Sequence, residues 1–248
     1  MKKRAVIVTG ALGGIGAPMC EEFHDSGYVV IALDRADGEV RASHYLREDI
    51  SQVVGDAAAR EGLVGRINGI LESEDAQLVG LINNAAVQIL GNTETLSADA
   101  WHETLDTNLL APFFLTQAFL KHLEEVGGSV VNVSSIHEKL TKADFLAYAT
   151  SKAALSGMTR AMAVELGGRV RVNAISPAAI ATPMLREGFK DNPEAYEQLG
   201  AAHPTQRIGK PEEVAKVARY LIEEAPLFLT GACLGLDGAI SSRLHDPA

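Results

Sequence analysis

The stretch RAVIVTGALGGIG, residues 4–16, decides the fold that the sequence predicts. It begins with a continuous apolar run at residues 4–9, which is typical of a strand buried on both faces. A glycine-rich turn follows at residues 9–16, and a helical pattern opens near residue 15. A buried strand that passes through a turn into a helix starts a strand–helix–strand unit, so the beginning of the chain predicts a parallel sheet.

The rest of the chain repeats this alternation. Further β-branched or apolar runs lie at residues 28–33, 78–82, 129–134, 170–175 and, more weakly, 232–236. Helical patterns lie at residues 15–26, 53–73, 97–125, 147–167 and 211–224. Such alternation implies parallel strands joined by right-handed crossovers, with helices on both faces. Because no linker, repeat or low-complexity run interrupts it, we predict one α/β domain over residues 1–248, built on a doubly wound parallel sheet.

Composition argues against several classes of partner. The net charge of −10 disfavours nucleic acid and anionic membranes, which would repel the chain overall. The apolar run at residues 5–8 is too short for a signal peptide, and no stretch reaches the length of a membrane span. Cys20 and Cys233 match no metal or redox spacing and suit reduced thiols, although the sequence leaves a bond between them open. No histidine pair has metal-ligand spacing. We expect a cytoplasmic protein with no metal.

Gly10, Gly14 and Gly16 allow a tight turn and a close approach of backbone to a pyrophosphate. The helix that follows offers free N–H groups and a partial positive charge to the same phosphates. The spacing G-x-x-x-G-x-G differs from the more familiar G-x-G-x-x-G. An ordinary glycine-rich turn is the alternative, but the position between a buried strand and a helix favours a dinucleotide cradle.

Asp34 ends the second predicted strand, 18 residues after Gly16. An acid near this spacing accepts hydrogen bonds from an adenosine ribose. Its charge repels a 2′-phosphate and Gly13 offers no basic side chain, so we expect NAD rather than NADP. Arg35 points the other way, because it could pair with a 2′-phosphate. A carboxylate that only caps a helix is a further alternative.

Tyr148 and Lys152 are four residues apart in a helical pattern, so the phenol and the ammonium can lie on one face. A Tyr-x-x-x-Lys pair occurs by chance in many helices, and the surrounding motifs must supply its meaning. Ser135 stands 13 residues before Tyr148, at the end of a predicted strand.

Taken in order, the motifs resemble the short-chain dehydrogenase/reductase family from Arg4 to about Gly238. The resemblance is carried by TGALGGIG (9–16), REDIS (47–51), NNAA (83–86), DTNLLAPFFLTQ (106–117), SPAAIATPM (176–184), RIGKPEEVAKVARYL (207–221) and TGACLGLDGA (230–239). It implies a Rossmann-type sheet of about seven strands. Ala86 and Ala178 stand where the family has glycine; alanine fits if the backbone φ is negative and costs stability if φ is positive.

The resemblance also implies a set of cofactor contacts. Asp49 would contact the adenine amine, Ile50 would lie beside the adenine ring, and Ile180 and Thr182 would hold the carboxamide. The whole set comprises Gly10, Leu12, Gly13, Gly14, Ile15, Gly16, Asp34, Arg35, Asp49, Ile50, Asn84, Ala85, Tyr148, Lys152, Ile180 and Thr182.

The catalytic residues implied by the resemblance are Asn108, Ser135, Tyr148 and Lys152. A free phenol titrates near pH ~10, and we expect the Lys152 ammonium and the cationic nicotinamide to lower the pKa of Tyr148. Tyr148 would then be the general acid/base, Ser135 would hold the substrate oxygen, and Asn108 would hold a water that connects Lys152 to solvent. Read singly, Ser135 could be a polar strand end and Asn108 a buried helix amide.

We therefore predict an NAD-dependent oxidoreductase that interconverts a secondary alcohol and a ketone. The alternatives are an NADP-preferring carbonyl reductase and an NAD-binding regulator without turnover. SSIHEK, residues 134–139, is similar to the corresponding segment of glucose dehydrogenases. A pair of His137 and Glu138 that bonds hydroxyls would favour a sugar, a polyol or another polar alcohol, whereas a solvated turn would have no substrate contact.

Two further expectations concern mobility and assembly. The segment 184–207 is expected to form a lid that sets specificity. Small residues, among them Ala153, Ala154, Gly157 and Ala161, would allow another helix to approach residues 151–166. The family resemblance implies that this helix and the one at 97–125 form a subunit interface, which predicts a homotetramer or homodimer.

Overall fold

The computed structural model describes residues 2–244 and contains a seven-stranded sheet in the order β3-β2-β1-β4-β5-β6-β7. All neighbouring strands run parallel, which confirms the predicted sheet. The strands are β1 (Lys3–Thr9), β2 (Val29–Asp34), β3 (His44–Arg47), β4 (Ala76–Asn83), β5 (Ser129–Val133), β6 (Arg171–Pro177) and β7 (Cys233–Leu236). The apolar runs in the sequence did not predict the position of β3. This half-buried edge strand reads HYLR and contains no continuous apolar run.

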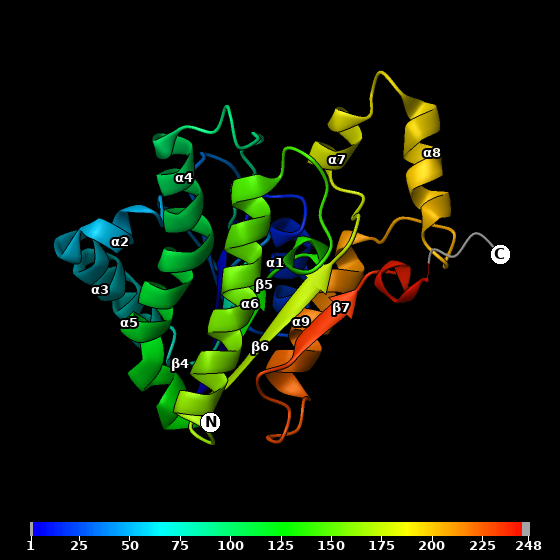
Figure 1. Ribbon diagram of the computed structural model, residues 1–248. Coiled ribbons are helices and arrows are strands. Elements are labelled where there is room, and N and C mark those ends of the chain that lie inside the picture. Colours follow the sequence, from blue (N-terminus) through cyan, green and yellow to red (C-terminus); the bar gives the residue numbers. More distant parts are fainter. Residues whose placement is uncertain (1, 245–248) are drawn as a thin grey trace.

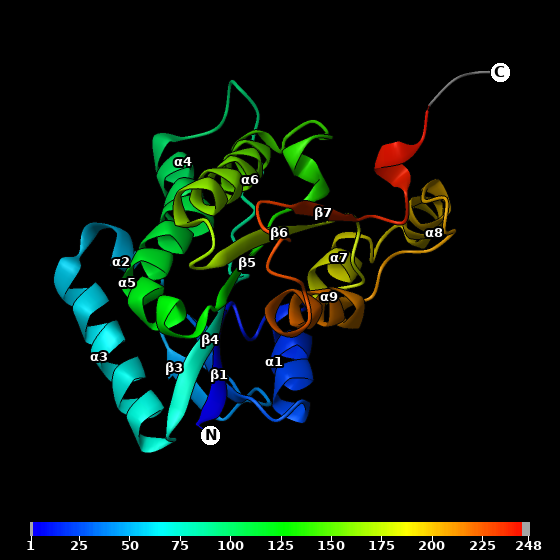
Figure 2. The ribbon, with the colours of Figure 1, turned by 90° about the horizontal axis from the view of Figure 1, so that it is seen from below.

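Helices cover both faces of the sheet (Figure 2). On one face lie α3 (Ala57–Ser73), α5 (Ala111–Val126) and α6 (Leu146–Leu166), whose buried side chains share a core with residues such as Ile7, Leu81 and Val130. On the other face lie α1 (Gly16–Asp25) and α9 (Pro211–Glu223), which pack on Val8, Ile82 and Ile175. Alternate residues of each strand therefore point into separate cores, and this explains why the strand sequences are continuously apolar.

Two of the predicted helices are divided in the structure. The segment 53–73 forms α2 (Gln52–Gly55) and α3, separated by Asp56, whose carboxylate accepts hydrogen bonds from the amides of Ala58 and Ala59. The segment 97–125 forms α4 (Ala98–Leu105), the π-helical turn η1 (Asp106–Leu110) and α5. An N-cap carboxylate begins a new helix. A π-helical turn interrupts the regular α-helical hydrogen bonds but lets the chain continue as a helix.

The carboxyl ends of the strands form one edge, where the predicted site residues Asp34, Asn84 and Ser135 end or follow their strands. The strand order reverses around β1, whose neighbours are β2 and β4, and a doubly wound sheet binds ligands at such a switch point. The turn η2 (Ile136–Glu138) follows β5 at this edge. Two short helices, α7 (Pro183–Gly188) and α8 (Pro193–Ala202), follow β6 and stand beyond the main body of the molecule (Figure 1). Of the helices within residues 2–244, none combines the length and apolar character needed to cross a membrane.

Candidate active site

The glycine loop between β1 and α1 leaves no room for side chains. Gly10 has φ +65°, and a Cβ there would stand 2.7 Å from the Cα of Ala85. A Cβ on Gly14 would stand 2.7 Å from the Cβ of Thr182, and one on Gly16 would collide with the carbonyl of Gly10. The loop therefore presents bare backbone at the start of α1, where helix N–H groups favour a phosphate. This geometry fits the pyrophosphate of a dinucleotide.

The segment after β4 is fastened to this loop. The hydroxyl of Thr9 accepts hydrogen bonds from the amides of Asn84 and Ala85, each at 3.0 Å. The side-chain amide of Asn84 donates to the carbonyls of Thr9 and Gly10 at 2.9 and 3.1 Å. The predicted contacts Asn84 and Ala85 therefore lie beside the glycines.

Ala86 and Ala178 fit without backbone strain. The non-glycine residues with positive φ in residues 2–244 are Asp75, Asp144, Gln206 and Ala239. Neither alanine that replaces a family glycine adopts the left-handed conformation, so the methyl group carries no backbone penalty at either position.

The carboxylate of Asp34 lies directly on the glycine loop. Its Oδ2 accepts a 2.9 Å hydrogen bond from the amide of Leu12, and its Oδ1 accepts one from the amide of Ala36 at 3.1 Å. The guanidinium of Arg35 lies 3.5 Å from the carboxylate of Glu103 on α4, and both side chains are largely exposed. The negative charge of Asp34 is thus held at the glycine loop, while the guanidinium of Arg35 lies near the carboxylate of Glu103.

Several other predicted cofactor contacts have structural partners of their own. Asp49 Oδ1 accepts hydrogen bonds from the amide and the hydroxyl of Ser51, at 3.0 and 2.8 Å. Ile50 is 5% exposed and belongs to one core. Ile180 belongs to the core on the opposite face of the sheet, and the partly buried Ile15 packs against that core. Thr182 caps α7 by accepting a 3.2 Å hydrogen bond from the amide of Leu185.

Lys152 is buried beneath the end of β5. Its Nζ donates a 2.7 Å hydrogen bond to the carbonyl of Val133 and lies 5.7 Å from the ring centroid of Tyr148. The side chain has little access to water, and burial lowers the pKa of Lys152 to about 7. The helix spacing thus brings the amine and the phenol onto one face, as predicted.

The pKa of Tyr148 differs from the expectation. Burial raises the pKa of Tyr148, and a hydrogen bond with Ser135 lowers it by less. The predicted decrease relied on two charges beside the phenol, the Lys152 ammonium and the cationic nicotinamide of the bound cofactor, and the structure tests the first of them. In the structure the amine instead bonds the carbonyl of Val133, and burial weakens its hold on a proton.

Asn108 lies in the π-helical turn η1 and fastens two segments together. Its Oδ1 accepts a 2.8 Å hydrogen bond from the amide of Val87. Its Nδ2 donates to the carbonyl of Val87 at 2.9 Å and to the hydroxyl of Ser151 at 3.0 Å. Both amide hydrogens are therefore occupied, and Asn108 ties the segment after β4 to α6.

An aromatic group that includes His137 borders Tyr148. The ring of His137 stacks on Phe145 with a centroid distance of 4.5 Å and an interplanar angle of 4°, and it meets Tyr148 edge-on at 5.6 Å. Its Nδ1 bonds the hydroxyl of Thr141 at 2.9 Å. Burial, with a smaller effect of Lys142, lowers the pKa of His137, which favours the neutral imidazole. The sequence reading missed Phe145, although its spacing of three residues from Tyr148 indicates a shared face.

Glu138 does not face a substrate. Its side chain is 4% exposed and accepts a hydrogen bond from the hydroxyl of Ser156 on α6. The interpretation of His137 and Glu138 as a hydroxyl-binding pair is therefore wrong for Glu138, because the turn η2 directs the carboxylate inward. Ser156 was missed, although it lies four residues after Lys152 on the same face of α6.

Within residues 2–244 no cluster of His, Cys, Asp and Glu side chains could hold a metal ion. The site instead combines a bare phosphate cradle, a fixed carboxylate and a phenol with a neighbouring hydroxyl and amine. Such a constellation can bind a dinucleotide and move a proton.

Comparisons with known proteins agree with this geometry. A family model described as enoyl-(acyl carrier protein) reductase matches residues 10–241. Acetoacetyl-CoA reductase of Acinetobacter sp. is 32% identical, with 96% of this chain and 98% of the relative covered. 3beta-Hydroxysteroid dehydrogenase 1 of Eggerthella lenta is also 32% identical, with coverage of 97% and 95%.

The chain belongs to the short-chain dehydrogenase/reductase family.

This short-chain dehydrogenase/reductase is an NAD(P)-dependent oxidoreductase that acts on CH–OH groups. The structure of aldohexose dehydrogenase from Thermoplasma acidophilum superposes with a TM-score of 0.90 at 30% identity, covering 100% of this chain and 97% of that one. 4-Hydroxyisoleucine dehydrogenase, solved with NADH, gives a TM-score of 0.83 at 27% identity, covering 98% and 100%. ElxO, solved with NADP, gives 0.84 at 26% identity with the same coverage.

Proposed function

We propose that this enzyme is an NAD-dependent dehydrogenase that interconverts a secondary alcohol and a ketone, with Tyr148 as general acid/base. The observation that carries the proposal is the convergence of Ser135, Tyr148 and Lys152 at the carboxyl end of β5. A phenol with a hydroxyl on one side and an amine on the other can exchange a proton with a substrate oxygen.

The protein side chains handle the proton and the substrate oxygen. NAD, when bound, supplies the carbon that accepts or returns the hydride, and its oxidised ring adds positive charge near the phenol. Tyr148 takes the hydroxyl proton of the alcohol in one direction and protonates the forming alkoxide in the other. Ser135 donates a hydrogen bond to the same oxygen and keeps it in line with the phenol. Lys152 would bond the nicotinamide ribose, and Asn108 would hold a water that connects Lys152 to solvent.

The cofactor would lie along the carboxyl edge of β1, β2 and β4. The cradle from Gly10 to Gly16 would hold the pyrophosphate, Asn84 and Ala85 would contact it from the side, and Ile180 and Thr182 would hold the carboxamide. Asp34 favours NAD, because its carboxylate is already fixed on the amide of Leu12 and would repel a 2′-phosphate. Arg35 points the other way, because its exposed 3.5 Å contact with Glu103 is weak and would leave the guanidinium able to meet that phosphate. An NADP-preferring carbonyl reductase is the rival.

The substrate we propose is a sugar, a polyol or another polar alcohol. The proposed recognition of substrate hydroxyls depends on His137, since the carboxylate of Glu138 faces inward. The imidazole borders Tyr148, and its Nδ1 is held by Thr141, which leaves Nε2 as the atom able to bond a substrate hydroxyl. Likeness to aldohexose dehydrogenase supports the same class. The segment 184–207, which contains all of α7 but its first residue and the whole of α8, would close over the bound substrate as a lid.

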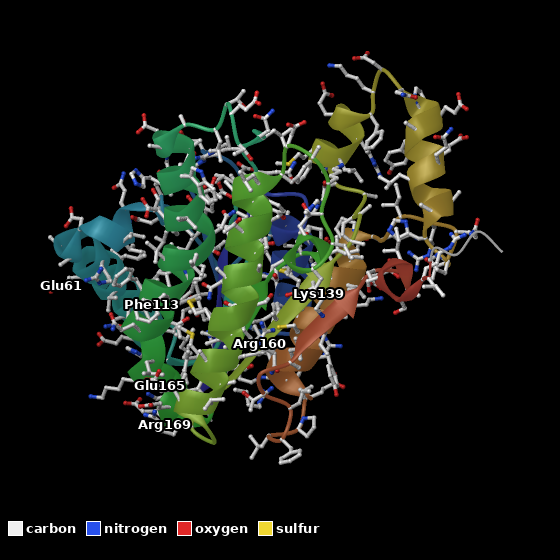
Figure 3. The ribbon with its side chains drawn as sticks, in the orientation of Figure 1. Glu61, Phe113, Lys139, Arg160, Glu165 and Arg169 are labelled. Carbon is white, nitrogen blue, oxygen red and sulfur yellow. The ribbon has the colours of Figure 1, made fainter. Side chains whose placement is uncertain are left out.

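We further propose a single-domain protein that forms homotetramers or homodimers through α6 and the segment 97–125, which comprises α4, η1 and most of α5. Figure 3 shows Phe113 on α5 and Arg160 and Glu165 on α6 along the outer side of these helices. Val164 is 86% exposed on α6, which suits a helix that packs on a second copy. Cys20 and Cys233 are both free thiols, which supports a reducing, cytoplasmic location.

The test is a substrate screen over sugars, polyols, hydroxy acids and steroids with NAD and NADP, following absorbance of the reduced cofactor. Turnover of a secondary alcohol with NAD supports the proposal. A strong preference for NADP would remove the argument from Asp34. NAD binding without turnover of any alcohol or ketone would favour a regulator instead, a reading that the complete set of Ser135, Tyr148 and Lys152 argues against.

A further inference from the structure

Glu138 is a buried carboxylate that the proposed mechanism does not use. Its side chain is 4% exposed, and a carboxylate this well covered is uncommon without a partner. The ammonium of Lys139 lies 3.4 Å away, but that lysine is 68% exposed and contributes little. The close partner is the hydroxyl of Ser156, on the face of α6 that also carries Tyr148 and Lys152.

A chain of hydroxyls links Glu138 to the reacting residues. Ser156 Oγ lies 2.9 Å from Ser134 Oγ, and Ser134 Oγ donates to the backbone carbonyl of Lys152 at 3.1 Å. Ser134 stands between Val133, whose carbonyl receives Lys152 Nζ, and Ser135. The two hydroxyls supply two hydrogens for three oxygen–oxygen contacts, so at any moment two of the contacts carry a hydrogen and the third is a close contact without one.

The network joins three elements that must be in register for the reaction. Glu138 ends the turn η2, which Ser135 opens by accepting a 3.2 Å hydrogen bond from the amide of His137. Ser134 continues β5, and its amide donates to the carbonyl of Ile175 on β6 at 2.7 Å. Ser156 belongs to α6. The carboxylate thus fixes the far end of the turn whose near end carries Ser135.

We propose that Glu138 is a positioning residue that holds the turn η2 against α6, so that Ser135 and His137 keep their places beside Tyr148. This role rests on the proposed function of the same site. Loss of the carboxylate would let the turn move, and a small misplacement of a group that orients substrate lowers the rate by about 10-fold to 100-fold. The carboxylate acts through Ser156 and Ser134 and touches neither substrate nor cofactor.

The variants that test this role are Glu138→Ala, Glu138→Gln and Ser156→Ala. A glutamine keeps the length of the side chain and supplies a hydrogen to the network, so it should restore function. Lys139→Ala is the matched control, because it removes the exposed partner of Glu138 and leaves the buried bond in place. Figure 3 shows Lys139 away from the outer side of α5, where Phe113 lies.

Two readouts are compared among variants that keep the wild-type fold and cofactor binding. Thermal unfolding checks the fold, and the Kd for NADH checks cofactor binding. For Glu138→Ala and Ser156→Ala we expect kcat to fall about tenfold or more, while Glu138→Gln and Lys139→Ala stay within about threefold of wild type. The second readout is the ultraviolet titration of Tyr148, taken as the difference from the same protein carrying Tyr148→Phe. The alanine variant should show a higher pKa for Tyr148 than the glutamine variant, because the lowering bond from Ser135 is lost.

These readouts separate the positioning role from the proposed function. If Glu138→Ala matches Lys139→Ala in both turnover and titration, the positioning role is overturned and the proposed function stands. Glu138→Gln decides the case in which Glu138→Ala loses its activity only because it loses its fold. If Glu138→Gln then titrates like wild type but turns over as slowly as Glu138→Ala, the role is also overturned. If no alcohol is oxidised even by wild type but the titrations differ as expected, the proposed function fails while the positioning of Ser135 beside Tyr148 holds.

Discussion

The amine of Lys152 donates a 2.7 Å hydrogen bond to the carbonyl of Val133, and this bond is sealed between α6 and the end of β5. Burial lowers the pKa of Lys152 from 10.5 to about 7. Between these values the unfolded chain binds a proton that the folded protein does not, so the unfolding free energy rises with pH from about 7 toward 10.5.

Replacement of this amine should flatten that pH dependence. In wild type the Lys152 contribution has a slope of up to about 1.4 kcal/mol per pH unit, and Lys152→Met should lose it. Urea unfolding of both proteins at pH 7 and pH 9 measures the difference. The control is Lys139→Met, at a lysine that is 68% exposed, which should keep the wild-type slope. An equal slope in all three proteins would show that Lys152 keeps its charge when folded.

The raised pKa of Tyr148 sets the direction of the pH–rate profiles. Alcohol oxidation needs the deprotonated phenol, so its kcat/KM should climb with pH through the alkaline range. Ketone reduction needs the protonated phenol, so its kcat/KM should be level near neutral pH and fall in that same range. Both profiles are measured on one alcohol–ketone pair between pH 6 and pH 11. An oxidation profile that is already level below pH 7 would contradict the raised pKa.

Asp34 should control the choice of cofactor. Asp34→Ala removes the charge that would meet a 2′-phosphate, and the ratio of kcat/KM for NAD to that for NADP should fall by about tenfold or more. Asp37→Ala is the matched control, since this nearby carboxylate is 79% exposed and paired with Arg47. The steady-state constants with each cofactor decide it. An equal NAD-to-NADP ratio of kcat/KM in Asp34→Ala and Asp37→Ala would mean that Asp34 accepts the hydrogen bond of the Leu12 amide and does not select the cofactor.

The two alanines in place of family glycines should be preferred over glycine in this chain. Ala86→Gly and Ala178→Gly should each lower the unfolding free energy by about 0.5–1 kcal/mol, because glycine gains freedom in the unfolded state. Ala239 has φ +67°, so Ala239→Gly should change stability in the opposite direction. Chemical unfolding of the three variants measures this, and a gain in stability for Ala86→Gly would contradict the backbone geometry.

Much of the fold could be predicted from the sequence, because strands buried on both faces are apolar throughout. β3 could not, since an edge strand lacks that pattern. The break at Asp56 carried a local signal, as Asp is a common N-cap, whereas the π-helical turn at Asp106–Leu110 has none in composition.

The placement of the candidate site residues could be predicted wherever spacing and backbone fix it. The glycines, the i,i+4 pair of Tyr148 and Lys152, and Asp34 at the end of β2 all follow from local rules. The directions of the Glu138 carboxylate and the Lys152 amine could not be read, because they depend on how η2 and β5 pack against α6. The direction of the Tyr148 pKa shift could not be read from the sequence either, because the burial that raises this pKa is a property of the folded chain.

The central claim is that Tyr148 moves the proton during alcohol oxidation, and Tyr148→Phe tests it most directly. The phenylalanine keeps the ring against His137 and removes only the hydroxyl. On a substrate of the wild-type enzyme, kcat should fall by at least about 100-fold while the Kd for NADH stays within about twofold. Turnover close to wild type, with NADH bound equally well, would contradict the account.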